Sequence, residues 1–140
     1  MRFEASIDIA APPERVFAVY SDVERWPEWT ASVTSVERLD EGPLRVGSRA
    51  RIRQPRLPVA VWEVTGLVPD RSFTWVARGP GIVTTGSHMV TPQEGGDQVT
   101  ATASLEQAGL LGPLMGRLTK RLTNEYLQTE VRGLKARCEA

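Results

Sequence analysis

The chain has 140 residues, of which 41% are hydrophobic and 24% are charged, a composition that predicts one globular domain over residues 1–140 and excludes disordered and fibrous proteins. Seventeen basic residues balance seventeen acidic ones, so no overall field attracts nucleic acid, and we expect no nucleic-acid partner. The single cysteine excludes an intrachain disulfide, and no apolar run has the form of a signal peptide or a transmembrane segment, so we expect a cytoplasmic protein.

The chain begins with a strand pattern that leads into helical signals. Residues 3–9 alternate apolar and polar side chains, the period of a half-buried strand. Pro12 and Pro13 end this strand and suit the first turn of a helix, where a missing N–H costs nothing. Helical spacing continues to Tyr20, and Pro27 limits a second helical element to a turn or two. We therefore expect one strand and two short helices.

The middle of the chain contains six strand-like runs separated by short breaks. The runs lie near 32–39, 47–54, 59–68, 71–78, 82–91 and 98–107. The breaks are rich in Gly, Pro and Asp, which is turn chemistry. Such short connections predict antiparallel pairing and exclude parallel crossovers.

The chain closes with one long helical pattern, near 111–138, whose apolar positions form two stripes. The first stripe is Leu111, Leu114, Met115, Leu118 and Leu122; the second is Leu127, Val131, Leu134 and Cys138. At 3.6 residues per turn the two stripes point in different directions. Either the helix kinks near Thr123-Asn124, or its two halves face different surroundings. A cavity under the first half and packed sheet under the second would explain the pattern.

Several motifs, taken in order, resemble those of a known superfamily. They are Ala11-Pro12-Pro13-Glu14-Arg15-Val16-Phe17, Val23-Glu24-Arg25-Trp26-Pro27-Glu28-Trp29, Gly42-Pro43-Leu44-Arg45-Val46-Gly47-Ser48, Trp62-Glu63-Val64, Val68-Pro69-Asp70-Arg71-Ser72-Phe73-Thr74-Trp75, Gly95-Gly96-Asp97-Gln98-Val99-Thr100, Gly109-Leu110-Leu111-Gly112-Pro113-Leu114 and Gly133-Leu134-Lys135. Over essentially its whole length the chain resembles the START-like superfamily of polyketide cyclase/dehydrase and lipid transport proteins, known as SRPBCC.

This resemblance implies a fold and a range of functions. The fold is the α+β helix-grip, a seven-stranded antiparallel sheet curled around a long C-terminal helix, with two short helices after the first strand. The superfamily resemblance also implies a hydrophobic pocket without a cofactor. Its members include carriers, ligand sensors, cyclases and cofactor-free hydrolytic or dehydrating enzymes, so the fold does not choose among these functions.

Strand alternation indicates which side chains face inward. Trp62 and Val64 alternate with polar neighbours, as do Phe73 and Trp75. Either core filling or pocket lining accounts for these residues, since a tryptophan N–H favours a polar partner that a pocket mouth can supply. The predicted ligand-binding residues are Phe17, Tyr20, Ile52, Gln54, Trp62, Val64, Phe73, Trp75, Thr84, Leu111, Met115 and Leu118. For Tyr20, as for Tyr126, core packing is the simpler role, and Trp26 and Trp29 are interpreted as structural.

His88 is the candidate catalytic residue. It is the only histidine, so metal sites built from several imidazoles are excluded and no metal is expected. Its parity with Ile82 and Val90 places it inward, where its ring would bind a ligand carbonyl or act as an acid or base. A hydrogen-bonded core histidine, or a surface one, is the simpler interpretation. Cys138 lies in the last helical turn, and no pattern brings it to His88.

The strand near 47–54 carries a local basic ladder, Arg49, Arg51 and Arg53, which alternation places on the outer face. A solvated strand face is the ordinary explanation. A docking patch for an acidic partner or a phosphate headgroup is the alternative. No aromatic residues are interleaved with these arginines, as nucleic-acid binding would require.

The sequence therefore favours binding of a small hydrophobic molecule, lipid-like or polyketide-like, between the sheet and the C-terminal helix. The alternative is a cyclase/dehydrase-type enzyme without a cofactor, acting on a similar ligand. Few ionisable residues are expected to face inward, and this scarcity favours binding. An interaction domain of a larger assembly is a third class, although no clear apolar outer face supports it. We expect a monomer or a homodimer.

Overall fold

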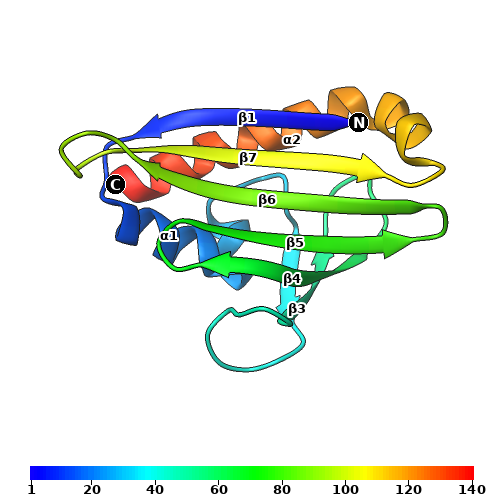
Figure 1. The fold of residues 1–140 in the computed structure, drawn as a ribbon, viewed down its shortest axis with the longest axis horizontal. Coiled ribbons are helices and arrows are strands. Elements are labelled where there is room, and N and C mark those ends of the chain that lie inside the picture. The colour runs from blue at the N-terminus through cyan, green and yellow to red at the C-terminus, as the bar shows by residue number, and fades with distance from the viewer.

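The computed structural model describes residues 1–140 as one curled sheet with helices on its concave side (Figure 1). The strands are β1 (Arg2–Ile9), β2 (Ser35–Arg38), β3 (Arg49–Arg53), β4 (Ala60–Val68), β5 (Ser72–Gly79), β6 (Ile82–Pro92) and β7 (Val99–Ala108). The helices are α1 (Pro13–Ser21), the 3-10 helix η1 (Val23–Glu28) and α2 (Gly112–Glu139). All strand pairs are antiparallel, in the order β1-β7-β6-β5-β4-β3-β2. This confirms the predicted helix-grip fold.

The first three elements follow from their local sequence. The burial of β1 alternates, with Phe3, Ala5 and Ile9 buried. Pro13 occupies the first turn of α1, and Pro27 lies inside η1, which stays a short 3-10 helix. α1 buries Val16 and Tyr20 against the rest of the fold, so these two short helices close one end of the space under the sheet.

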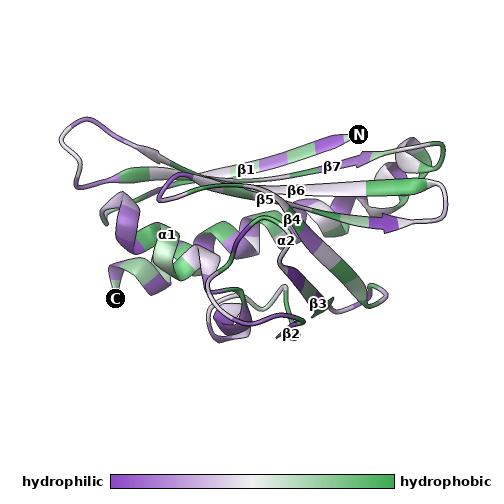
Figure 2. Cartoon of the chain, turned by 60° about the horizontal axis from the view of Figure 1, so that its bottom comes forward, coloured by the Kyte–Doolittle hydropathy of each residue, from purple (hydrophilic) through white to green (hydrophobic).

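The sheet bends so that it can enclose the long helix. Figure 2 shows β2 and β3 turned away from the plane of β1, β7 and β6, on the same side of the sheet as α2. The pairing of β4 with β5 shifts register between Val64 and Gly66, and a bulge of this kind increases bend and twist. α2 lies against β1 and β7. No helix is long and apolar enough to cross a membrane.

The rotation of α2 corrects one prediction. The second apolar stripe is buried, as expected, but Leu114 and Leu118 of the first stripe are 55% and 72% exposed. The first half of α2 approaches β7 through its glycines instead. A Cβ at Gly112 would lie 2.7 Å from the Gln107 carbonyl oxygen, and one at Gly116 would meet Met1. The helix runs unbroken from 112 to 139, and Leu114 and Leu118 point away from the sheet because the glycines allow the close approach.

Candidate functional site

A cavity of about 90 Å³ lies between the concave face of the sheet and the middle of α2. It is lined by Trp26, Ser32, Val33, Ile52, Gln54, Leu57, Trp62, Trp75, Gly86, His88, Ala103, Ser104, Leu105, Thr123, Tyr126, Leu127 and Glu130. This volume is smaller than that of a cavity known to hold benzene, about 150 Å³. A molecule of the size of benzene or larger would therefore enter this cavity with one end only, or after its walls move.

Tryptophan side chains form much of the cavity wall. Trp62 from β4 and Trp75 from β5 lie with ring centroids 5.8 Å apart, and Trp26 from η1 lies 5.4 Å from Trp75. Gly86 on β6 makes this possible, because a Cβ there would lie 3.1 Å from Trp75 Nε1. The absence of a side chain at Gly86 thus lets the Trp75 ring lie flat across the neighbouring strand. Trp26, interpreted from sequence as structural, is both buried and part of the cavity wall.

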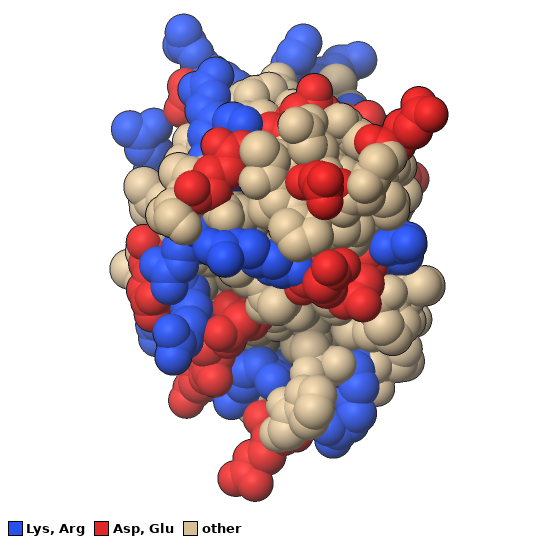
Figure 3. Space-filling view, turned by 90° about the vertical axis from the view of Figure 1, so that its left-hand side faces the viewer, with Lys and Arg blue, Asp and Glu red and all other residues tan.

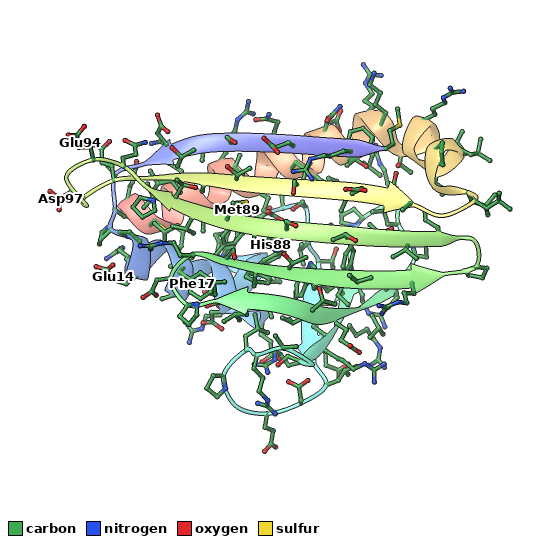
Figure 4. All side chains as sticks on the ribbon, viewed as in Figure 1. Glu14, Phe17, His88, Met89, Glu94 and Asp97 are labelled. Carbon is green, nitrogen blue, oxygen red and sulfur yellow. The ribbon has the colours of Figure 1, made fainter.

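His88 is buried and faces the cavity, while Met89, the next residue of β6, points to the outer side and is 46% exposed (Figure 4). The His88 ring stacks on Phe73 with centroids 4.1 Å apart. Its Nδ1 lies 3.1 Å from the Phe73 carbonyl oxygen. A carbonyl only accepts, so Nδ1 carries the proton and Nε2 is left as an acceptor. Burial lowers the pKa of His88 to about 3, which keeps the ring neutral.

Glu130, on α2, is the polar cavity residue that the sequence argument missed. It is 8% exposed, and burial raises the pKa of its carboxyl to about 7. The Tyr20 hydroxyl donates a hydrogen bond of 2.7 Å to Glu130 Oε2, and burial raises the pKa of Tyr20 well above its ordinary value. The available signal was spacing: Glu130 lies three residues after Leu127 and four before Leu134, within the buried stripe.

His88 and Glu130 bring an acceptor and a weak acid to one apolar cavity. The Tyr20 ring connects them, because it lies edge-on to the His88 ring, 5.1 Å away, and its hydroxyl holds Glu130. A carboxyl with a pKa near 7 is about half protonated at neutral pH, so it can donate as well as accept. The cavity can therefore hold a ligand hydroxyl or carbonyl, or move a proton.

Further polar groups surround the cavity. Gln54 donates through Nε2 to the Ser32 carbonyl oxygen at 3.1 Å, which leaves its amide oxygen available. Trp62 Nε1 is buried and has no hydrogen-bond partner. The Tyr126 hydroxyl donates to the Pro55 carbonyl oxygen, which ties α2 to the loop between β3 and β4. An unpaired buried N–H such as that of Trp62 is costly, and a ligand oxygen would satisfy it.

Five of the predicted site residues line the cavity: Ile52, Gln54, Trp62, Trp75 and His88. Tyr20, Val64 and Phe73 are buried in the core but do not line it. Four more of the predicted residues, Thr84, Leu111, Met115 and Leu118, also lie outside it. Thr84 lies nearer the start of β6 than His88, and Leu111 precedes α2. Met115 and Leu118 lie in the first half of α2, which approaches β7 through its glycines. Phe17 lines a separate open hollow beside α1.

The arginine ladder lies on the outer side of β3, with Arg49 and Arg53 exposed. Arg51 forms an ion pair with Glu37 of β2 at 2.6 Å. No group of three or more His, Cys, Asp or Glu side chains is placed to hold a metal ion.

Comparison with known proteins agrees with this architecture. A family model described as "Polyketide cyclase / dehydrase and lipid transport" matches residues 1–139. A START superfamily protein from Mycobacterium smegmatis superimposes with a TM-score of 0.79 at 19% identity, over 99% of this chain and 97% of the other. The Zhui aromatase/cyclase from Streptomyces sp. R1128 has a TM-score of 0.79 at 14% identity, over 99% and 93%. No curated protein matches in sequence. At these identities the structural neighbours show the fold alone.

Proposed function

The chain belongs to the polyketide cyclase / dehydrase and lipid transport family, and on that basis we propose that its cavity binds a small, largely apolar molecule carrying one or two oxygen atoms. The observation that supports this most directly is the cavity wall, in which tryptophans surround a few polar groups. Ligand sites combine an apolar lining with a few placed polar groups in this way. His88 Nε2 would accept from a ligand hydroxyl, and Trp62 Nε1 would donate to a ligand oxygen.

The experiment uses naphthol as a probe, because it has a fused aromatic ring system and one hydroxyl. Binding is followed by the change in tryptophan fluorescence that a ring beside Trp62 and Trp75 should cause. Ala103 is buried on the cavity wall, so Ala103→Leu should fill part of the space and weaken naphthol binding at least about tenfold. The matched control, Ala108→Leu, changes an exposed residue of the same strand and should leave binding unchanged. Equal binding of naphthol by both variants would show that the probe binds outside the cavity.

Native mass spectrometry of co-purifying molecules then identifies the natural ligand.

A second candidate function, acid–base catalysis of the dehydratase type, is favoured by the pairing of His88 and Glu130 in one cavity. In such a reaction the neutral His88 Nε2 would take the proton next to a ketone, and protonated Glu130 would give its proton to the departing hydroxyl. The products are an unsaturated ketone and water, and the proton on His88 returns to the Glu130 carboxylate through solvent. The aldol adduct of benzaldehyde and acetone is a suitable probe, because its dehydration gives strongly absorbing benzalacetone. No acceleration over buffer would remove this second candidate and leave the binding proposal standing.

A further inference from the structure

Four leucines lie exposed where β7 leads into α2. Leu110 is 92% exposed, Leu111 41%, Leu114 55% and Leu118 72%. We call these four residues the leucine patch. The protein has eleven exposed large hydrophobic side chains, and four of them fall within these nine residues of sequence. Figure 2 shows apolar colour at this end of the molecule, where β7 turns into the helix. A contiguous exposed apolar patch usually marks an interaction surface.

Unpaired cations accompany the leucine patch. Arg117, Lys120 and Arg121 are all exposed, and none of them takes part in an ion pair or a side-chain hydrogen bond. Residues 107–124 contain no Asp or Glu, so this segment carries three positive charges in a protein whose net charge is zero. The opposite end of the molecule, which faces the viewer in Figure 3, carries both signs side by side, and several of its charges are paired. The segment that carries the leucine patch therefore has three positive charges and no negative one.

Two of the leucines and two of the cations share one face of α2. Leu114, Arg117, Leu118 and Arg121 are spaced three, four and seven residues apart, the spacing of a single face. Figure 1 shows the beginning of α2 at an extreme end of the molecule. Neither the cavity nor the hollow beside α1 includes any residue of 108–122. This surface is the tip of that end of the molecule.

We propose that residues 110–121 dock the protein on anionic lipid bilayers. The leucine patch would enter the boundary between headgroups and acyl chains, and the three cations would lie at the level of the lipid phosphates. An acidic protein would have to supply a concave apolar surface that matches the tip, whereas a fluid bilayer deforms around it. Self-association would bring like charges together. This docking is independent of the ligand proposal, because the leucine patch and the cavity share no residue.

The test is cosedimentation of the full chain with vesicles of phosphatidylcholine alone and of phosphatidylcholine mixed with phosphatidylglycerol. We expect binding to the mixed vesicles only, decreasing as salt screens the cations. Leu110→Ser with Leu118→Ser should weaken binding at least about tenfold, since both side chains lose apolar contact. Lys120→Gln or Arg121→Gln should each weaken it about fivefold. All of these residues are exposed, so the variants should keep the wild-type melting temperature.

The matched controls are Val46→Ser, which removes an apolar side chain 60% exposed on another surface, and Arg132→Gln, which removes an exposed cation farther along α2. Both should bind vesicles like the wild type. The proposal is overturned if mixed vesicles are not bound, or if the leucine and control variants bind equally. Binding to polyglutamate without binding to vesicles would overturn the proposal and show that the partner of this surface is an acidic protein. Concentration-dependent self-association, lost in the leucine variant without vesicle binding, would assign it to a second copy of the chain.

Discussion

Burial moves the pKa of His88 and that of Glu130 in opposite directions, and both shifts favour the uncharged form of the side chain. The pKa of His88 falls from 6.5 to about 3, and the pKa of Glu130 rises from 4.5 to about 7. In each case the apolar surroundings disfavour the charged form. The hydrogen bond from Tyr20 opposes the shift of Glu130 but does not cancel it. The polar end of the cavity is thus adapted to neutral hydrogen-bonding groups.

The role of His88 separates catalysis from binding. If His88 acts as the base in dehydration, His88→Gln should lower the rate on the benzaldehyde–acetone adduct by about 10²–10⁴ while naphthol affinity stays within about tenfold. If the protein only binds, the same change should alter naphthol affinity by about 1 kcal/mol or less, with no turnover to lose. Met89→Ala is the control, because Met89 points outward from the same strand. A dehydration rate unchanged by His88→Gln would exclude His88 as the base.

Glu130 should make the protein less stable as the pH rises. Its folded-state pKa lies above its ordinary value, so the stability provided by the neutral carboxyl is fully present below pH 4.5 and lost as the pH rises through about 7. The side chain introduced by Glu130→Gln cannot ionise, and its amide oxygen can still accept the hydrogen bond from the Tyr20 hydroxyl. In urea unfolding, the variant should match the wild type near pH 4 and exceed it by about 3 kcal/mol near pH 8.

The comparison isolates Glu130, because both proteins keep His88. The pKa of His88 is depressed, so its contribution is present above pH 6.5 and lost as the pH falls toward about 3, equally in both. It therefore cancels in the difference between variant and wild type. A difference that stays constant across the pH range would show that the Glu130 pKa is not raised by folding.

At the scale of elements, glycines determine how α2 sits on its neighbours. A Cβ at Gly133 would lie 1.9 Å from the Trp29 carbonyl oxygen, a backbone atom that cannot rotate away. Gly133 thus allows the second half of α2 to pass directly over the end of η1. This contact positions Glu130, one turn earlier, against Tyr20.

Gly133→Ala should therefore destabilise the fold by about 2 kcal/mol or more, measured by urea unfolding. Helix propensity alone predicts the opposite sign, a gain of about 0.5–1 kcal/mol. The control is Gly66→Ala, because a Cβ at Gly66 would meet no atom within 4 Å. A Gly133→Ala protein as stable as the wild type would mean that α2 does not approach η1 this closely.

At the scale of the whole molecule, the cavity exists because the curled sheet and the helix cannot meet everywhere. α2 lies closely on β1 and β7 at its glycine-rich beginning and at its buried final turns. Between these contacts, residues of β3, β4 and η1 form the wall that faces α2, and the tryptophans do not fill the space completely. The two proposed activities use separate regions: the cavity at the middle of α2 and the lipid-docking tip at its beginning.

Much of this architecture could be predicted because strands follow a period of two. Alternation is a local property, so it placed His88, Trp62, Trp75, Gln54 and Ile52 on the inner face, where the structure brings them together around the cavity. Turn residues at short spacing likewise predicted the antiparallel order. The family motifs extended that order to the helix-grip fold, which the strand order confirms.

The rotation of α2 was decided only by the tertiary structure. A helix with two apolar stripes can turn either of them inward, and the choice depends on contacts with residues distant in sequence, such as Met1, Gln107 and Trp29. Those contacts favour the rotation of α2 that turns its glycines and the second stripe inward. Leu118 therefore faces solvent, while Glu130 enters the cavity beside Tyr20. By itself the sequence determined the inner face of the sheet, because strand alternation is local; the inner face of the helix required the packed fold, because helix rotation is set by contacts across the whole chain.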